Sequence, residues 1–552
     1  MSEASLFVRK ATGLVRSWSV FDAFIYAFFS INLVTLGLYI ISQMYFFEGG
    51  LVPAMVVSGV IILAECVVYA GLIAVMPRAG GDYVWQSRIL GGFVGFVLAV
   101  TGWWFILWLW TPLYADMLRH IFFVPILGVL GLKNLALDVA WNPHWWMAVV
   151  VITLIFVSVV IALGMKAYAR VQKFCFWVGN AGLLVVCLML LFSNNANFRA
   201  GLEANAGQLF GAAPGVYEAT MAAGAEAGGV TPLFGGTLTA IFLLMPFLVF
   251  FNLWPNWGAT LYGEVKGADD FKRNLAGMAW ALIATTVLGV IFFLLVNKTM
   301  TWDFLRNANA AYWNFRWGYT AVAPPLNIWP YPALLAVFTT SSRLLQLVVM
   351  LAMSMWFFGW AGTVFLSSTR VIFAAAFDRI LPERAASVEP RTRTPIWALI
   401  LMVVPGLIVS YLFVYDVANF KSLTLASTLV IAVTYLGSTI AAILLPYIKK
   451  DLYNASPIAK YKVLGIPLIS VCGVIFGAFL VFLLYQWLVD PNLLYGLVYF
   501  YNEAGERTTN LTSLIFMGAM YLLAVVIYLV ARSVRKSQGV DLRIVYKEIP
   551  AE

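Results

Sequence analysis

The sequence predicts an all-α polytopic membrane protein with twelve transmembrane helices. Of its 552 residues, 62% are hydrophobic and 11% are charged, with a mean hydropathy of +0.90, whereas about a quarter of the residues in a soluble domain are charged. Apolar runs of about 20 residues, the length that crosses a bilayer, recur along the whole chain. Basic residues gather in alternate loops between these runs. Together these observations exclude a soluble domain.

The predicted spans cover residues 18–45, 51–76, 92–118, 144–164, 171–193, 235–262, 275–298, 344–376, 396–415, 422–447, 466–488 and 511–532. The first sixteen residues are polar and basic, and the apolar run that follows is too long for the hydrophobic region of a signal peptide. We therefore expect the first span to be retained as an anchor. The polar stretches at about 194–234 and 299–343 are expected outside the bilayer.

The distribution of charge predicts the orientation. With twelve spans both termini share a side, and that side holds 25 of the 34 basic residues, against nine on the other side. The positive-inside rule then places both termini in the cytoplasm, in a multi-pass protein of the plasma (cell) membrane. The net charge of +9 is explained by these loops, so we expect no nucleic-acid partner.

The sixth span is interrupted in its middle. Its sequence there reads Asn252-Leu253-Trp254-Pro255-Asn256-Trp257-Gly258, and Pro255 lacks the N–H that a continuous helix needs. Backbone groups freed at membrane depth are tolerated where they are buried in protein or line a cavity, and interrupted helices form the substrate sites of secondary transporters. A simple proline kink is the alternative interpretation.

Polar residues in three other spans are candidates for function. The first span carries Ser30 and Asn32, which either contact neighbouring helices or reach a cavity if the helix opens. In the second span Glu65 lies near mid-membrane, either as a neutral residue bonded to a neighbour or as a coupling site. The hydroxyls of the eighth span, at Thr363, Ser367 and Ser368, either bond back to their own helix or help to hold a cation; these three and Glu65 are our candidates for the coupling ion.

The remaining residues give no sign of catalysis. The four cysteines lie in apolar runs without the spacing of a metal site, and both histidines, His120 and His144, are expected beside the loop after the third span. We find no nucleophile–base or paired-carboxylate arrangement, so we expect no enzyme, no cofactor and no metal. Asp378, Arg379, Glu383 and Arg384 are expected to form a solvated group of ion pairs.

Three separated stretches resemble motifs of permeases of the amino acid/polyamine/organocation (APC) superfamily. They are Pro77-Arg78-Ala79-Gly80-Gly81-Asp82-Tyr83 after the second span, Glu264-Val265-Lys266 with Arg273-Asn274 after the sixth, and Ser368-Thr369-Arg370 through Asp378-Arg379-Ile380-Leu381-Pro382 to Thr394-Pro395 after the eighth. Their order, spacing and side of the membrane agree with the family. The resemblance covers about residues 10–490.

The resemblance implies a LeuT-like fold, with an inverted five-helix repeat as its core and two further C-terminal helices. The divisions that it implies are a cytoplasmic segment at 1–17, the first repeat at 18–193, an extracellular loop at 194–234, the second repeat at 235–450, helices 11 and 12 at 451–533, and a cytoplasmic tail at 534–552.

The resemblance also implies that the first and sixth spans unwind at mid-membrane and bind the substrate together. It assigns to the site Ser30, Ile31, Asn32 and Leu33, whose backbone amides hold a carboxylate, and Phe250, Phe251, Asn252, Trp254, Pro255 and Asn256, with carbonyls for an amine and with Phe250 or Phe251 as an aromatic gate. The sequence departs from the family where the first span usually opens through a Gly-x-Gly run and where the sixth carries a glycine, near Trp254.

We therefore expect a secondary active transporter that imports amino acids, neutral or apolar ones, by alternating access. Its partners would be a small amino acid or amine substrate, the lipid bilayer, and a proton or sodium ion, of which we favour the proton. The alternatives are a sodium-coupled transporter, an exchanger for amines or polyamines, and a transport-inactive binding or sensor protein of the same fold.

Overall fold

The computed structural model describes residues 13–421, 429–490, 500–501, 507–508 and 510–547. Its described part contains twelve helical spans, some built from several segments, that are long and apolar enough to cross a membrane, which confirms the predicted all-α polytopic membrane protein with twelve spans. The predicted tenth span begins at residue 422, and its first seven residues lie outside the described ranges. The same is true of residues 1–12 of the predicted N-terminal segment and of residues 548–552 of the tail.

The first five spans are built from eleven helical segments. They are α1 (Val20–Ile31), η1 (Leu33–Gly37) and α2 (Leu38–Ile41); α3 (Leu51–Val75); α5 (Gly92–Val100), η2 (Thr101–Phe105), α6 (Ile106–Leu118), η3 (Arg119–Phe123) and α7 (Val124–Val129), all in the third span; α9 (Pro143–Ala162); and α10 (Met165–Phe192). The segments η1, η2 and η3 are π-helical turns.

The seven later spans are, in order, α13 (Leu238–Asn252) with η4 (Pro255–Glu264), α14 (Phe271–Met300), α17 (Arg343–Trp360) with α18 (Gly362–Phe377), α19 (Ile396–Val414), α21 (Leu429–Ile448), α23 (Leu468–Val489) and α24 (Leu511–Ser537). Here η4 is a 3-10 helix, a tighter winding in which the backbone bonds run between residues three apart. The sixth span is therefore α-helical in one half and 3-10 in the other.

Short elements connect the spans. They are α4 (Asp82–Ile89), α8 (Lys133–Trp141), α11 (Asn195–Phe210), α12 (Val216–Glu226), α15 (Trp302–Arg316), α16 (Pro332–Val337), η5 (Glu383–Ala386), η6 (Val417–Asn419), α22 (Lys450–Asn454), η7 (Pro457–Lys460) and α25 (Leu542–Val545). Two antiparallel pairs of two-residue strands complete the described chain: β1 (Lys462–Val463) with β2 (Ile466–Pro467), and β3 (Phe500–Tyr501) with β4 (Arg507–Thr508).

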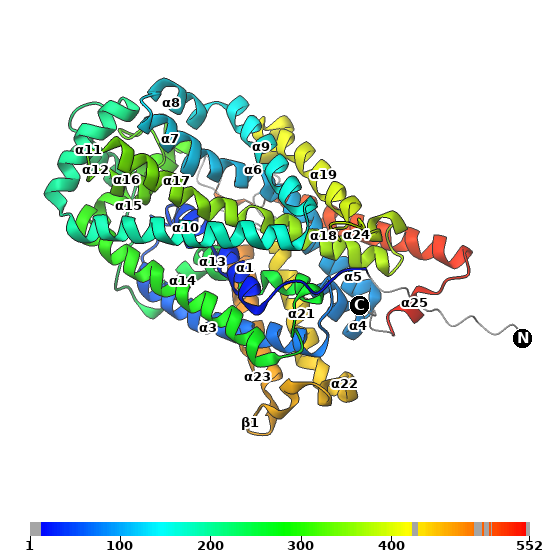
Figure 1. The fold of residues 1–552 in the computed structure, drawn as a ribbon. Coiled ribbons are helices and arrows are strands. Elements are labelled where there is room, and N and C mark those ends of the chain that lie inside the picture. Colours follow the sequence, from blue (N-terminus) through cyan, green and yellow to red (C-terminus); the bar gives the residue numbers. More distant parts are fainter. Residues whose placement is uncertain (1–12, 422–428, 491–499, 502–506, 509, 548–552) are drawn as a thin grey trace, which may run out of the picture.

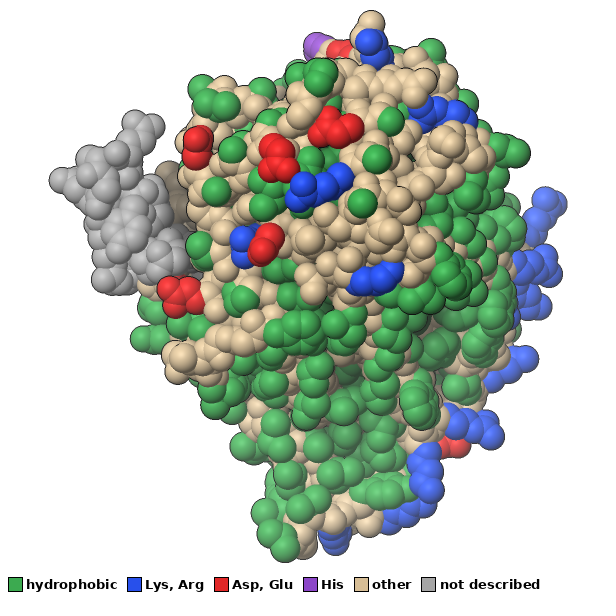
Figure 2. All heavy atoms as spheres, turned by 90° about the vertical axis from the view of Figure 1, so that its left-hand side faces the viewer, with side chains coloured by type: hydrophobic (Ala, Val, Ile, Leu, Met, Phe, Trp, Pro, Cys, Tyr) green, Lys and Arg blue, Asp and Glu red, His purple; other side chains and the backbone are tan. Residues whose placement is uncertain are grey.

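The ends of the helix bundle differ in what they carry. The first and last described residues of the chain and α4, α5 and α25 lie at one end, which we call the terminus side, whereas α8, α11, α12, α15 and α16 cover the opposite end, which we call the loop side (Figure 1). Between them, Figure 2 shows a broad surface of hydrophobic side chains below a more polar cap. Side chains of the spanning helices such as Phe174 and Trp177 on α10 and Trp280 on α14 are more than half exposed, as expected of groups that face lipid.

Two predictions about the loops are wrong. The third span continues through η3 and α7 to Val129, because its apolar pattern does not end at residue 118, so His120 is buried inside a helix and does not flank a loop. Asp378 is likewise buried and paired with Arg88, so it does not belong to a solvated group of charges. A partner on a distant element decided the burial of each.

Candidate functional site

The first span breaks at Asn32, between α1 and η1. Asn32 adopts a left-handed backbone conformation (φ 46°, ψ 79°), which asparagine tolerates better than most residues. Its side-chain N–H donates to the carbonyl of Trp356 (3.0 Å), and its side-chain oxygen accepts from the amide of Thr35 (2.8 Å). The asparagine thus ends one helical segment and caps the next.

The residues around this break are buried and mostly satisfied. Ser30 donates to the Tyr26 carbonyl of its own helix (2.7 Å), and Ile31 and Leu33 on either side of Asn32 have no exposed surface. The hydroxyl of Thr35 is the polar atom of this break without a hydrogen bond. The first break therefore uses its polar side chains to hold its own shape.

The sixth span breaks directly after Asn252. Leu253 and Trp254 leave the helical conformation, and Pro255 begins η4 at the position where its missing N–H leaves no bond unmade. Asn252 donates to the hydroxyl of Ser58 on α3 (2.8 Å), whereas its side-chain oxygen has no partner. Both polar atoms of the Asn256 side chain are buried without a hydrogen bond.

The two phenylalanines before the break face different neighbours. Phe251 is fully buried against the first span: a methyl group placed on Gly37 would lie 2.7 Å from a carbon of the Phe251 ring. Phe250 is partly exposed and packs on Trp487 of α23, with 5.5 Å between ring centroids. Of the two gate candidates, Phe251 is the one that contacts the broken part of the first span.

Aromatic rings surround the sixth-span break. Trp257 packs on Trp103 and Trp110 of the third span, with ring centroids 4.6 and 5.7 Å apart, and Trp254 contacts Trp110 at 5.4 Å. The ring of Tyr435, on α21, lies 6.1 Å from Trp103 and 6.3 Å from Trp254. The Asn256 side chain lies beside the Tyr435 hydroxyl without the geometry of a hydrogen bond. These five rings form an apolar wall around unbonded amides.

The hydroxyls of the eighth span contact a phenol of the first span. Tyr26 donates to the Thr363 carbonyl (2.7 Å) and lies 2.8 Å from the hydroxyl of Ser367, which donates to the Trp257 carbonyl (3.1 Å). Ser368 bonds back to Val364 in its own helix (2.8 Å). The oxygens that a sodium ion would need are thus already engaged, apart from the Thr363 hydroxyl.

Two acidic residues lie behind the sixth-span break. Glu65 on α3 is fully buried, and neither of its carboxylate oxygens has a hydrogen bond. Asp82, at the start of α4, accepts from Tyr69 (2.8 Å) and Ser438 (2.6 Å) on one oxygen, whereas its other oxygen has no partner. Burial raises the pKa of the Asp82 carboxyl to about 6, and the hydrogen bonds from Ser438 and Tyr69 oppose this rise.

The terminus side of the two breaks is closed by contacts between the three sequence motifs. Glu264, at the end of η4, accepts both N–H groups of an Arg370 fork (2.7 and 3.2 Å), and its carbonyl accepts from the amide of Trp18 (3.1 Å). Gly80 donates to the carbonyl of Thr260 in η4 (2.8 Å). The motifs therefore lock α1, η4, α18 and the loop before α4 together.

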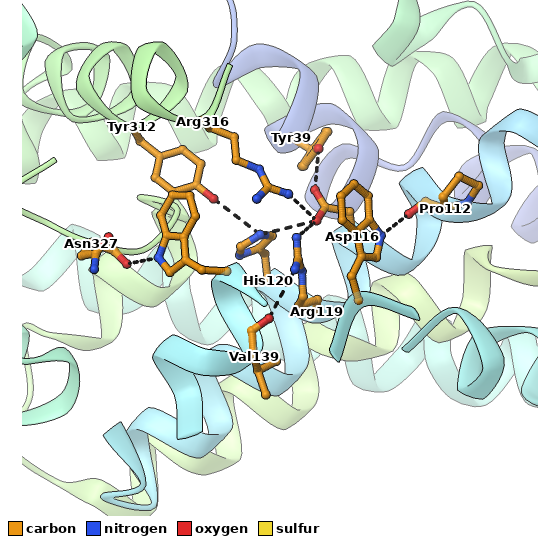
Figure 3. A network of polar contacts seen from close by, with 11 residues as sticks. Tyr39, Pro112, Asp116, Arg119, His120, Val139, Tyr312, Arg316 and Asn327 are labelled. Atoms are coloured by element: carbon orange, nitrogen blue, oxygen red, sulfur yellow. Dashed lines mark hydrogen bonds and ion pairs between the residues drawn. The ribbon is translucent and has the colours of Figure 1, made fainter. Parts of the chain in front are cut away.

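The loop side is closed by a different set of buried charges around Asp116 (Figure 3). The Asp116 carboxylate accepts from Tyr39 of the first span (2.9 Å), from Arg316 of α15 (3.1 Å) and from Arg119. His120 lies 3.7 Å from the same carboxylate. This loop-side cluster joins the outer half of the broken first span to the third span and to a helix beyond the bundle.

The family model for amino acid permeases matches residues 19–500. The chain belongs to the amino acid permease family. No curated protein matches the chain. The family indicates amino acid transport by a multi-pass membrane protein, and a transporter instead of an enzyme. In the described part of the permease, no group of three or more His, Cys, Asp or Glu residues could hold a metal ion.

Sequence reasoning missed several residues of this permease that lie at the break. Trp103 and Trp110 were visible as a tryptophan-rich third span, but four tryptophans at varied spacing do not indicate which of them face inward. Asp82 and Tyr435 gave no separate signal, because one lies in a turn motif and the other in an ordinary apolar run. Tyr26 could have been found as a phenol one helical turn before Ser30.

Proposed function

We propose that this permease is a secondary active transporter that imports a neutral, apolar or aromatic amino acid by alternating access. The observation that carries the proposal is the sixth-span break, where the side-chain oxygen of Asn252 has no partner and the unbonded amide of Asn256 lies beside aromatic rings. Amide groups can accept from an amine and donate to a carboxylate, and aromatic faces suit an apolar side chain and attract an ammonium group. Arg370 is paired with Glu264, so its charge does not compensate the side-chain carboxylate of an acidic amino acid.

In this proposal the two breaks bind different groups of the substrate. The substrate carboxylate is held at the first break by the backbone amides that follow Asn32, because the first N–H groups of a helical segment have no partner within it. The amine is held by carbonyls and amides of the sixth break, from Asn252 to Asn256. Phe251 closes over the bound substrate from the loop side.

Alternating access requires that the two sides open in turn. The breaks are buried at both sides, with the loop-side cluster around Asp116 on one side and the Glu264–Arg370 pair on the other. We propose that this is an occluded state of the transport cycle. Opening to one side breaks one set of charges while the other set holds.

We propose protons as the coupling ion. Glu65 is buried with no hydrogen bond to either oxygen, and a carboxyl group in such a place is a site for a proton. A sodium site at the eighth-span hydroxyls is disfavoured because Tyr26 already bonds to the Thr363 carbonyl and contacts Ser367. The cation would have to displace a satisfied phenol.

A two-step experiment tests this function. Purified permease is first screened by thermal shift against amino acids, amines and small amides, because a ligand that binds the folded state raises the melting temperature. The stabilising amino acids are then offered to proteoliposomes with an imposed pH gradient, with and without sodium. We expect uptake of neutral, apolar or aromatic amino acids that depends on the pH gradient and is lost in Glu65→Gln.

Other outcomes separate the alternatives. Selective uptake of glutamate or aspartate would overturn the substrate class, and uptake of polyamines alone would favour the amine exchanger. Binding without accumulation would indicate a sensor protein. Uptake that requires sodium, ignores the pH gradient and survives Glu65→Gln would discard proton coupling.

We also propose that both termini lie in the cytoplasm of a cell whose plasma membrane holds the permease. The support is the excess of Lys and Arg in the loops on the terminus side. A protease-sensitive tag placed at the C-terminus should be cleaved only after the cells are permeabilised. Cleavage in intact cells would reverse the orientation.

A further inference from the structure

Glu65 and Asp82 are two buried carboxyl groups on neighbouring elements. Tyr69, one helical turn after Glu65 on α3, donates to Asp82 (2.8 Å). Three of the four carboxyl oxygens have no hydrogen bond. Two buried carboxylates without a cation cannot both be ionised at low cost.

The surroundings of the pair contain no free cation among the described residues. The segments packed most closely against α3 are α13, α14, α21, α23, η4 and η7. Their ionisable side chains are Lys272, Arg273 and Lys298 on α14, Tyr435 and Tyr447 on α21, Cys472 and Tyr485 on α23, Tyr262 and Glu264 on η4, and Lys460 on η7. The four cations among these are exposed at helix ends.

The cations nearer to Asp82 are engaged elsewhere. Arg88, on the same short helix, is paired with Asp378 (2.5 Å). Arg370, on the neighbouring α18, is paired with Glu264 (2.7 Å). Arg78 donates to the carbonyl of Pro77. The positive charge that the pair of acids needs must therefore come from a ligand.

The hydrogen bonds indicate which acid holds the proton. Asp82 receives two hydroxyl donors, from Tyr69 and Ser438, and such donors favour a carboxylate. Glu65 receives none, so the neutral acid is cheaper there. Burial still raises the pKa of Asp82 to about 6, which keeps that group close to the working range as the second acceptor.

Unbonded groups connect these acids to the sixth-span break. The indole N–H of Trp103 lies beside Asp82, and the Tyr435 hydroxyl lies within electrostatic reach of both acids and beside Asn256. The polar atoms of Trp103, Tyr435 and Asn256 are all buried and without a hydrogen bond. Several donors and acceptors thus converge on one region that holds no partner for them.

We propose that Glu65 and Asp82 form a single proton-binding site, linked to the sixth-span break through Tyr435 and Asn256. This inference rests on the proposed function only in what the proton drives, not in whether the proton binds. One proton from the solution binds the pair, which then carries one negative charge instead of two. Its release to the solution on the other side of the cycle restores both charges.

A backbone contact can couple this proton to the substrate. Gly80, two residues before Asp82, donates to the Thr260 carbonyl in η4, and η4 also carries Asn256. A shift of η4 when the substrate enters the break therefore moves Asp82 relative to Glu65. Because the interaction between the two acids depends on their separation, the affinity for the proton changes with occupancy of the break.

An infrared titration of the purified permease in liposomes tests the site without any substrate. The probe is the proton alone, and the readout is the absorption of protonated carboxylic acid between about pH 5 and pH 9, a range in which exposed Asp and Glu are ionised. We expect one such band in the parent, and a midpoint shifted by about one pH unit or more both in Glu65→Gln, where Asp82 alone can hold the proton, and in Asp82→Asn, as expected for interacting acids. Glu226→Gln, at an exposed site on the loop side, should leave the band unchanged.

Two milder variants keep the test valid if Glu65→Gln or Asp82→Asn fails to fold. Ser438→Ala removes one donor to Asp82 and should shift the midpoint in a folded protein, and Tyr435→Phe should keep the band but abolish its shift on substrate binding. No titrating band in the parent, or a midpoint unmoved by Asp82→Asn and Ser438→Ala, would overturn the proposal. Absence of amino acid uptake with the band intact would instead refute the proposed function and leave the proton site standing.

Discussion

The first and sixth spans are both interrupted near their middle, yet the two breaks treat their polar side chains differently. At the first break Asn32 uses its amide to bond Trp356 and Thr35, and Ser30 bonds its own helix. At the sixth break the side-chain oxygen of Asn252 and both polar atoms of the Asn256 side chain have no hydrogen-bond partner.

This difference indicates which break recognises side-chain chemistry. A buried polar group without a partner costs about 1–3 kcal/mol, so a protein keeps it where a ligand will satisfy it. We infer that the first break binds the substrate through its backbone, whereas the side chains of the sixth break and the aromatic wall around it select the substrate. Four predictions test whether the two breaks differ in this way.

The largest effect is expected at Asn256. Asn256→Ala should lower amino acid uptake into proteoliposomes about 10–100-fold, because the substrate loses one or two hydrogen bonds of about 1–3 kcal/mol. The melting temperature should not fall, because the amide has no partner within the protein. Ser30→Ala is the matched control at the first break and should change uptake less than about threefold. Equal losses in the two variants would contradict the comparison.

The next effect concerns the gate. Phe251→Ala should lower uptake about tenfold or more, whereas Phe250→Ala should have a milder effect, because Phe251 contacts Gly37 and Phe250 contacts Trp487. Uptake is measured against protein amount after size-exclusion chromatography, since a buried Phe→Ala change also costs about 3–5 kcal/mol of stability.

A second pair of variants isolates the contact of Phe251 with the first span. Gly37→Ala places a methyl group where the Phe251 ring now lies and should reduce uptake by itself. Combining it with Phe251→Leu should restore part of the activity. If the double variant is as poor as the sum of both changes, the ring does not act through Gly37.

A smaller effect is expected at Asn32, and on stability. Asn32→Ala removes the bonds to Trp356 and Thr35 and leaves a non-glycine residue without side-chain support at φ 46°, at a cost of about 1–3 kcal/mol. In thermal unfolding this should lower Tm by about one to three degrees. Asn32→Gly keeps the backbone conformation and should lose less. A Tm unchanged in Asn32→Ala, with uptake abolished, would assign substrate recognition to the first break as well.

The smallest effect is a pH dependence of the melting temperature that comes from Asp82. The folded pKa of Asp82 is about 6, above the ordinary value of 3.8, so the folded state binds the proton more tightly than the unfolded state does. The stabilisation is fully present below pH 3.8 and is lost as pH rises through about 6. Tm should therefore decline by about one or two degrees between about pH 4 and pH 7, and Asp82→Asn should flatten the decline. A Tm that rises over this range in the parent would show that Asp82 is not buried as an acid.

The membrane-spanning architecture and the place of the sixth break could both be predicted from the sequence alone. Twelve apolar runs produced twelve spans, because the bilayer sets the length of a helix whatever its neighbours are. Pro255 fixed the end of α13 to within a few residues, because it cannot donate the bond that would continue the helix. The motifs at Pro77–Tyr83 and Ser368–Pro382 indicated the family.

Which side chains contact each other could not be predicted from the sequence, because these contacts depend on the arrangement of the helices. Asp116 and Arg316 are 200 residues apart in the chain yet share a hydrogen bond, and Asp82 lies near Glu65 because the chain turns back after α3. The sequence shows Asn32 and Asn256 as similar polar residues in apolar spans. Their roles differ because Trp356 packs where it accepts from Asn32, whereas no described residue makes a hydrogen bond to the side chain of Asn256. Which polar side chains pair depends on the positions of distant helices, and the local sequence pattern does not indicate those positions.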